Sequence, residues 1–201
     1  MSKNDAQGKK LMATTLPKQK ILLGVTGASG MLFLSSFLES LSGLDVTVHG
    51  VCSASGRDVL RMEQGLTPEK LSVVSRWFDY DDLSAPPASG SSNYSSMVVL
   101  PCTMGTLAAI AGGLSINLIH RAADVILKER KRLVLAVRET PLNRTHLKNM
   151  LSVHDAGAVI CPTMPSYYLQ PKTLEQAAES YSWRLADQLG LNIPNRKRWK
   201  S

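Results

Sequence analysis

With 201 residues, of which 44% are hydrophobic, the chain is long enough for one well-packed domain and has an ordinary globular composition. No apolar run reaches the length of a membrane span, and the lysine-rich stretch 1–20 lacks the apolar core of a signal peptide, so we expect a cytoplasmic protein. The net charge of +7 comes from the two ends, since residues 1–20 and 194–201 contribute +4 each and leave the rest near −1. This distribution disfavours nucleic-acid binding.

Five short, β-branched apolar segments predict buried parallel strands, and helical patterns separate them. The predicted strands are Lys20–Val25, Asp45–Cys52, Met97–Leu100, Arg132–Val137 and Ala158–Cys161. The predicted helical segments are Gly30–Leu41, Ser55–Gln64, Pro68–Trp77, Thr103–Ala111, Ile116–Arg130, Thr145–Ala156 and Thr173–Gly190. The alternation predicts a single α/β domain with a doubly wound parallel sheet over residues 20–193, between basic tails at 1–19 and 194–201.

Ligands of a doubly wound sheet bind outside the carboxyl ends of its strands, and three predicted loops there are small and rich in hydroxyl groups. They are Thr26–Gly30, Ser53–Ser55 and Pro101–Thr106. Each loop opens a predicted helix, whose first N–H groups can bind an anion. One such loop is weak evidence, but three at one sheet edge favour a phosphorylated ligand.

The first loop, Gly27-Ala28-Ser29-Gly30, leaves other interpretations to consider. It lacks the Gly-x-Gly-x-x-Gly pattern of dinucleotide sites and the second glycine of the Gly-x-Ser-x-Gly nucleophile elbow. A tight turn without a ligand stays open for this loop taken alone. The histidines fall on a strand or on helices, where a structural role is favoured over catalysis. The three cysteines are expected to be free thiols, and no Cys/His spacing indicates a metal site.

Charged residues are also expected near the carboxyl ends of the predicted strands. Arg138 and Glu139 directly follow the fourth predicted strand, where a carboxylate could exchange protons or hold a cation. Arg121 and Lys128 share one face of a predicted helix, and Asp124 can bridge back to Arg121. For this helix a solvated charged face is the alternative. Further candidate phosphate ligands are Tyr168 and Arg184.

The same segments resemble one known family. They read GVTGASG, APPASGSS, MVVLPCTMGTLAAIAGG, NLIHRAADVILKERKRLVLAVRETPL, HLKNML, GAVICPTMP and RLADQLG. From about residue 20 to 199 the chain resembles the UbiX-type flavin prenyltransferases, which have a flavodoxin-like (Rossmann-like) fold and are typically dodecamers. The resemblance implies transfer of a dimethylallyl group from dimethylallyl monophosphate to N5 and C6 of reduced FMN. It also implies that the prenylated FMN serves a UbiD-type decarboxylase, with a place in ubiquinone biosynthesis.

The resemblance further implies roles for individual residues. Flavin contacts would fall on Gly27, Ala28, Ser29, Ser53, Thr103, Met104, Gly105, Thr106 and Arg138. Prenyl-phosphate contacts would fall on Lys128, Glu139, Tyr168 and Arg184, with the aromatic Trp199 of the C-terminal tail completing the site in the oligomer. Glu63 and Arg121 match further polar positions there and join Lys128 and Glu139 as candidate catalytic residues. No metal is implied, because cationic side chains and N–H groups would offset the phosphate charge.

Some positions depart from the family pattern. Leu83 stands where some members carry a Trp whose π face could stabilise an allylic cation. The stretch from Glu63 to Asp82 is shorter than in typical members of the family. Met31–Leu34 replaces a pattern of small residues, so we expect different packing there. Three rivals are a flavin-dependent cysteine decarboxylase, a non-catalytic flavin carrier and a direct aromatic-acid decarboxylase. The first is disfavoured because Pro101–Thr106 does not match its motif.

Overall fold

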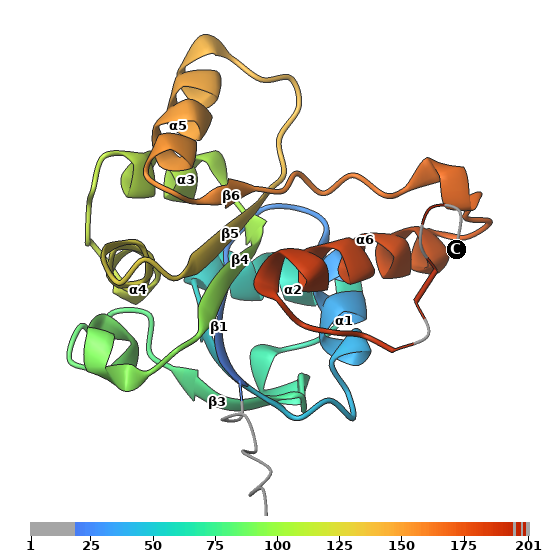
Figure 1. The fold of residues 1–201 in the computed structure, drawn as a ribbon, viewed down its shortest axis with the longest axis horizontal. Coiled ribbons are helices and arrows are strands. Elements are labelled where there is room, and N and C mark those ends of the chain that lie inside the picture. Colours follow the sequence, from blue (N-terminus) through green and yellow to red (C-terminus); the bar gives the residue numbers. More distant parts are fainter. Residues whose placement is uncertain (1–18, 195, 198, 200–201) are drawn as a thin grey trace, which may run out of the picture.

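In the computed structural model, residues 19–194, 196, 197 and 199 are described. Six parallel strands form one sheet in the order β3-β2-β1-β4-β5-β6 (Figure 1). The strands are β1 (Gln19–Val25), β2 (Val46–Cys52), β3 (Val74–Phe78), β4 (Ser96–Cys102), β5 (Arg132–Val137) and β6 (Val159–Ile160). The predicted doubly wound sheet is confirmed, and its order reverses between β1 and β4, where such folds bind their ligands. Most of the two predicted tails lies outside the described residues.

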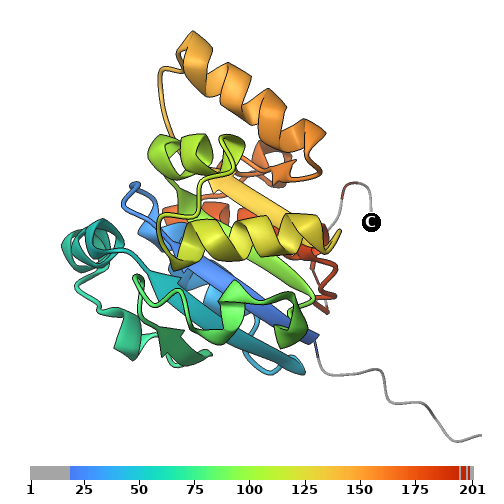
Figure 2. The same cartoon turned by 90° about the vertical axis from the view of Figure 1, so that its left-hand side faces the viewer.

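Helices cover both faces of the sheet (Figures 1 and 2). The helices are α1 (Met31–Ser40), α2 (Ala54–Gln64), α3 (Met104–Ala111), α4 (Leu118–Lys128), α5 (Arg144–Asp155) and α6 (Leu174–Leu189). The buried core divides accordingly: α1, α2 and α6 pack on one face, and α3, α4 and α5 on the other. Met31 and Leu34 are fully buried at the start of α1, and Phe33 meets Tyr181 of α6 edge-on. The long apolar side chains of this segment thus fill the α1–α6 interface.

One predicted element is wrong. The stretch Pro68–Trp77 was expected to be helical, but it forms a single 3-10 turn, η1 (Pro68–Lys70), followed by the edge strand β3. Val74 and Phe78 are buried, Trp77 packs partly buried against the core, Ser75 and Arg76 are exposed, and β3 pairs with β2. Pro68 supplies a helix-start signal that the chain uses for one turn only, because the next apolar side chains are buried against the sheet.

The Pro/Gly/Ser-rich stretch 84–96 runs over the α4 face of the sheet. It contains two short 3-10 turns, η2 (Pro86–Ala88) and η3 (Gly90–Ser92), and η2 packs against α4. Lys20 anchors its end, since the Lys20 carbonyl accepts from Ser95 N–H at 2.8 Å and its Nζ donates to the Ser92 carbonyl at 3.3 Å. The loop therefore forms one continuous surface with α4.

The three cysteines are free thiols, as predicted. Cys52 and Cys102 are buried, and burial raises the pKa of each thiol to about 12. Both thiols stay protonated at neutral pH and act as small core residues.

Candidate active site

Thr26 links the first loop, which follows β1, to the third loop, which follows β4, at the point where the strand order reverses. Its Oγ1 donates to the Pro101 carbonyl at 2.8 Å and accepts from the Thr103 N–H at 2.9 Å. The side chain is buried, so both hydrogen bonds are sheltered from water. Thr26 is not among the predicted site residues, although a hydroxyl directly at the end of a buried strand was the signal that could have found it.

Glu63 of α2 occupies the N-terminus of α1. Its Oε2 accepts from the N–H groups of Gly30 at 2.9 Å and Met31 at 2.8 Å, and the Ser29 hydroxyl also bonds to the carboxylate. Partial burial would raise the pKa of Glu63, but these hydrogen bonds and nearby Arg138 outweigh it and hold the pKa below its ordinary value. The chain's own carboxylate therefore fills the anion position of α1, and a ligand phosphate is left to α2 and α3.

The N-termini of α2 and α3 carry hydroxyl caps and no carboxylate. Ser53 Oγ accepts from Gly56 N–H at 3.0 Å, and Thr103 Oγ1 accepts from Thr106 N–H at 3.2 Å. The first turn of α3 is open, because a Cβ at Gly105 would meet only the Thr103 hydroxyl, at 4.0 Å. Unpaired N–H groups of a first turn plus hydroxyl donors are the donor set that suits a flavin phosphate.

Gly27 lets the first loop lie directly against the second. A Cβ built on Gly27 would overlap the side chain of Ser55, so only glycine permits this approach. Ala28, the next residue, is buried. The predicted flavin contacts Gly27, Ala28, Ser29, Ser53, Thr103, Met104, Gly105 and Thr106 are thus brought together at one edge of the sheet.

A cavity of about 330 Å3 lies beside this edge and carries the charged pair after β5. Arg138 and Glu139 are exposed, and Glu139 Oε1 accepts from the Thr140 N–H at 2.9 Å. The lining residues are Ser29, Gly30, Phe33, Val137, Arg138, Glu139, Thr140, Pro162, Thr163 and Met164. The structure therefore brings Ser29, Arg138 and Glu139 together around one opening, with Glu63 beside them through its contact with Ser29.

A second cavity of about 330 Å3 is linked to the first by the segment 162–169, because residues 162–164 line the first cavity and Ser166, Tyr168 and Leu169 line the second. Its walls carry the predicted phosphate ligands Tyr168 and Arg184 together with Trp199, whose ring centroid lies 4.9 Å from that of Tyr168. The remaining lining residues are Ser166, Leu169, Ser180, Trp183, Asp187, Arg196 and Lys197. Three cationic side chains against one carboxylate suit an anionic ligand.

Arg121 and Lys128 lie on α4 and line neither of these two cavities. Arg121 donates from Nε to the Ala88 carbonyl at 3.2 Å and pairs with Asp124 at 2.9 Å, which confirms the predicted bridge. Lys128 pairs with Glu129 at 2.5 Å, just before β5 begins. Because Arg138 follows the other end of that strand, Lys128 and Glu139 are roughly 20 Å apart, one strand length. A single copy does not bring these two candidate catalytic residues together.

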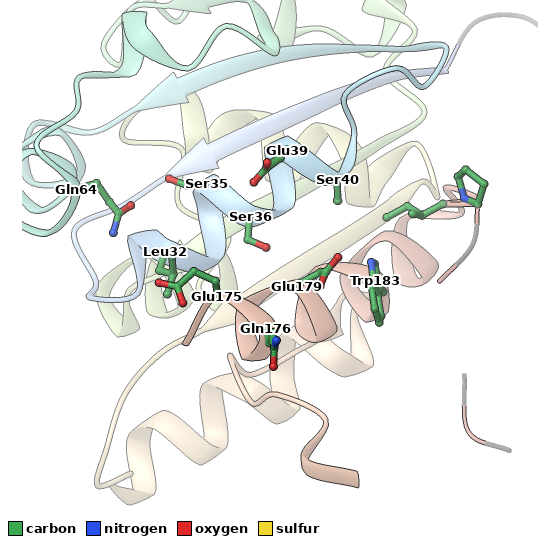
Figure 3. Close-up of a pocket in the computed structure, with 12 residues that line it drawn as sticks. Leu32, Ser35, Ser36, Glu39, Ser40, Gln64, Glu175, Gln176, Glu179 and Trp183 are labelled. Atoms are coloured by element: carbon green, nitrogen blue, oxygen red, sulfur yellow. The ribbon is translucent and has the colours of Figure 1, made fainter. Parts of the chain in front are cut away.

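A third cavity, of about 720 Å3 between α1 and α6, has the opposite charge (Figure 3). Glu39, Glu175 and Glu179 line it, and its described lining includes no Lys or Arg. An anionic ligand would be repelled there, so the cavity of highest volume among the three is not the substrate site.

Comparison with known proteins identifies the family. Residues 10–180 match the model of the Flavoprotein family. A Bacillus subtilis protein named probable UbiX-like flavin prenyltransferase is 40% identical over 183 residues, which cover 90% of each chain. The chain belongs to the UbiX-type flavin prenyltransferase family.

Two solved structures of this family share the fold. AnUbiX (PadA1), crystallised with FMN and dimethylallyl pyrophosphate, superposes with a TM-score of 0.88 at 38% identity and covers 92% of this chain and 98% of its own. A dodecameric FMN-dependent UbiX-like decarboxylase from Escherichia coli O157:H7 gives a TM-score of 0.87 at 34% identity and covers 91% and 100%. Within the described residues, no helix combines the length and the hydropathy needed to cross a bilayer.

Proposed function

We propose that the protein transfers the dimethylallyl group of dimethylallyl monophosphate to reduced FMN and releases prenylated FMN. The observation that carries the proposal is the pair of cavities joined by the segment 162–169, one beside the N–H-rich edge with Arg138 and Glu139, the other cationic and aromatic. The first has the donors for a flavin phosphate, and the second has those for a prenyl phosphate. Membership of the family and the FMN-bound neighbour support the flavin as FMN.

Several of the predicted residues have distinct roles in this chemistry. When bound, reduced FMN supplies N5 and C6, the two atoms to which the dimethylallyl carbons are joined. Lys128 and Arg184 offset the charge of the departing phosphate, and Tyr168 donates a hydrogen bond to it. Glu139, or the released phosphate itself, accepts the proton lost from C6. Glu63 acts through other groups, since it holds Ser29 and the first turn of α1 in place.

The preference for a monophosphate over a diphosphate is supported by the acidic run Asp79–Asp82. Enzymes that ionise prenyl diphosphates gather aspartates around magnesium. Here Asp79 accepts from Asp81 N–H at 2.9 Å, and Asp82 accepts from Ser84 N–H at 2.9 Å, so these carboxylates bind their own turns. The described residues gather no group of three His, Cys, Asp or Glu side chains that could hold a metal ion.

Because Lys128 lies roughly a strand length from Glu139, we propose that α4 of another copy supplies Lys128 and Arg121 to the site. A homo-oligomer, of the dodecameric kind formed by the Escherichia coli protein, would provide that copy. Delivery of the product to a UbiD-type decarboxylase, a role in ubiquinone biosynthesis and a cytoplasmic location stay predictions from the family resemblance.

The two remaining alternatives, a direct decarboxylase and a flavin carrier, predict that the flavin is not modified. A direct decarboxylase, the activity ascribed to the Escherichia coli protein, and a flavin carrier would both leave FMN unchanged in mass. Neither is favoured by a residue in the cavities. His120 is buried against Asn117 at 3.0 Å, and His49 bonds to Tyr94 at 2.8 Å, so both are held by structural partners away from the two cavities.

Mass spectrometry of the flavin tests the proposal. Reduced FMN and dimethylallyl monophosphate are incubated with the full chain without oxygen, and the extracted flavin should gain one C5H8 unit. Parallel reactions without the prenyl phosphate and with the diphosphate act as controls. Recovery of unmodified FMN from the complete reaction would refute prenyl transfer, and faster conversion with the diphosphate would reverse the assigned leaving group.

A further inference from the structure

We infer that Asp187 and Arg196 form a positioning pair that holds the C-terminal segment so that Trp199 lies against Tyr168 in the cationic cavity. Neither residue is assigned a role by the family motifs quoted above. The inference deepens the proposed function and rests on it only for the identity of the ligand, a prenyl phosphate. The placement of Trp199 stands on the contacts themselves.

The chain after α6 folds back along that helix. Leu191 and Ile193 are buried in the core next to α6 and fix the first part of the segment. Arg196 then forms an ion pair with Asp187 of α6, and its side chain is 7% exposed while that of Asp187 is 26% exposed. A guanidinium sheltered to this degree needs a charged partner, because an unpaired buried charge is strongly unfavourable. The pair is therefore a specific anchor.

The aromatic contact depends on this anchor. Trp199 is three residues beyond Arg196 and meets Tyr168 nearly at right angles, at 88°. Yet Trp199 remains 64% exposed and Tyr168 51% exposed, so the ring contact alone buries little apolar surface. Ordering a segment costs conformational entropy, which a partly exposed ring pair offsets poorly. The ion pair adds a constraint three residues before Trp199.

The Asp187–Arg196 pair lies close to Arg184, the residue predicted to bind the phosphate. Arg184 lies one helical turn before Asp187, and Arg184, Asp187 and Arg196 all line the same cavity as Trp199. A shift of the C-terminal segment would therefore move Trp199, Arg196 and Lys197 relative to Arg184. Positioning of this kind affects the binding of the prenyl phosphate more than the chemistry at the flavin.

The variant Asp187→Asn separates positioning from plain electrostatics, because the two predict opposite signs. Removing a negative charge makes the cavity more positive, so electrostatics alone would tighten the binding of a phosphate. If the pair positions the segment, the loss of the anchor weakens binding despite the added positive charge. We expect the KM for dimethylallyl monophosphate to rise about 10-fold or more, with the KM for FMN unchanged.

Fluorine NMR tests the anchor without using activity. The full chain labelled with 5-fluorotryptophan should show resonances for Trp77, Trp183 and Trp199, and Trp199→Phe assigns the third. In Asp187→Asn the Trp199 resonance should narrow and move toward the position of an exposed tryptophan, while that of Trp77, which lies outside this cavity, stays in place. Glu69→Gln is the matched control, since it breaks the 2.6 Å ion pair with Arg57, which lies outside both substrate cavities.

A charge exchange completes the test. The double variant Asp187→Arg with Arg196→Asp restores an ion pair in reversed order and should recover much of the Trp199 signal and of the KM, and it covers the case in which Asp187→Asn folds poorly. An unmoved Trp199 resonance or a lowered KM in Asp187→Asn would overturn the inference, as would a double variant no better than the single one. If the wild-type enzyme fails to prenylate FMN, the proposed function fails, whereas the NMR comparison still judges the anchor.

Discussion

The edge of the sheet at Thr26 and the outer face of α4 contain similar polar and charged residues, but the fold treats them differently. At the edge, Thr26 and Glu63 bind backbone groups that are 77 and 32 to 33 residues away in the chain, so separate loops are fixed against one another. On α4, the ion-pair partners of Arg121 and Lys128 are Asp124 and Glu129, their neighbours in sequence, although Arg121 also donates one hydrogen bond to the distant Ala88 carbonyl. Folding of one chain therefore fixes the proposed flavin end of the site, whereas the charges of α4 stay partly exposed, where we propose that another copy uses them.

The largest expected effect concerns the carboxylate on the preorganised side. Glu139→Gln keeps the shape and the hydrogen bond to Thr140 but cannot accept a proton, so product formation should slow about 10²–10⁴-fold while FMN affinity stays near the wild-type value. Rates come from quenched reactions analysed by mass spectrometry, and affinity comes from flavin fluorescence. A wild-type rate would transfer the role of base to the released phosphate.

Lys128→Ala tests the part of the site that we propose another copy supplies. Loss of one charge-assisted contact to the leaving group should lower turnover about 10²–10³-fold with little change in FMN binding. Arg184→Ala should behave in the same way.

Mixed oligomers then sharpen the comparison. When Lys128→Ala and Glu139→Gln copies are co-expressed with different tags and purified together, random pairing leaves both residues intact in about a quarter of the sites, and that fraction of activity should return. Lys128→Ala mixed with Lys128→Ala under the other tag is the control. Mixed oligomers as inactive as their parents would show that one copy supplies both residues.

Thr26→Val tests the junction between the first and third loops. The variant leaves the Thr103 N–H and the Pro101 carbonyl without their shared partner in a buried place, which should destabilise the protein by about 1–3 kcal/mol and weaken FMN binding. Urea unfolding followed by circular dichroism measures the loss, with Thr26→Ser as the control because it retains the hydroxyl. Equal stability of the Val and wild-type proteins would contradict the role of Thr26.

The smallest effect is expected at Glu63. Since hydrogen bonds hold the pKa of Glu63 below 4.5 in the folded protein, its ionised form adds stability that is present above that pH and is lost as the pH falls through the lower, folded value. Glu63 is exposed to solvent, so the difference between wild type and Glu63→Gln should stay below about 1 kcal/mol at pH 7. Thermal unfolding at pH 7 and below pH 4 compares the two proteins. A difference that grows on acidification would have the wrong sign.

Much of the fold could be predicted because its strongest signals are local. Short β-branched runs and helical periodicity located five of the six strands and all six α-helices of the described residues, since burial on both sides of a parallel sheet demands such runs. The Arg121–Asp124 bridge was predictable for the same reason, as its partners are one helical turn apart. The hydroxyl-rich loops at strand ends were likewise visible in the sequence.

Only the tertiary structure decided the rest. Strand β3 exists because Val74 and Phe78 pack on a sheet that begins elsewhere in the chain, whereas its own residues follow a helix-start signal. Glu63 was expected beside the site, but its capping of α1 depends on the angle at which α2 approaches the first loop. The separation of Lys128 from Glu139 follows from the direction of α4 relative to β5. Such relations join residues that no local pattern connects, so they arise from packing and not from spacing in the sequence.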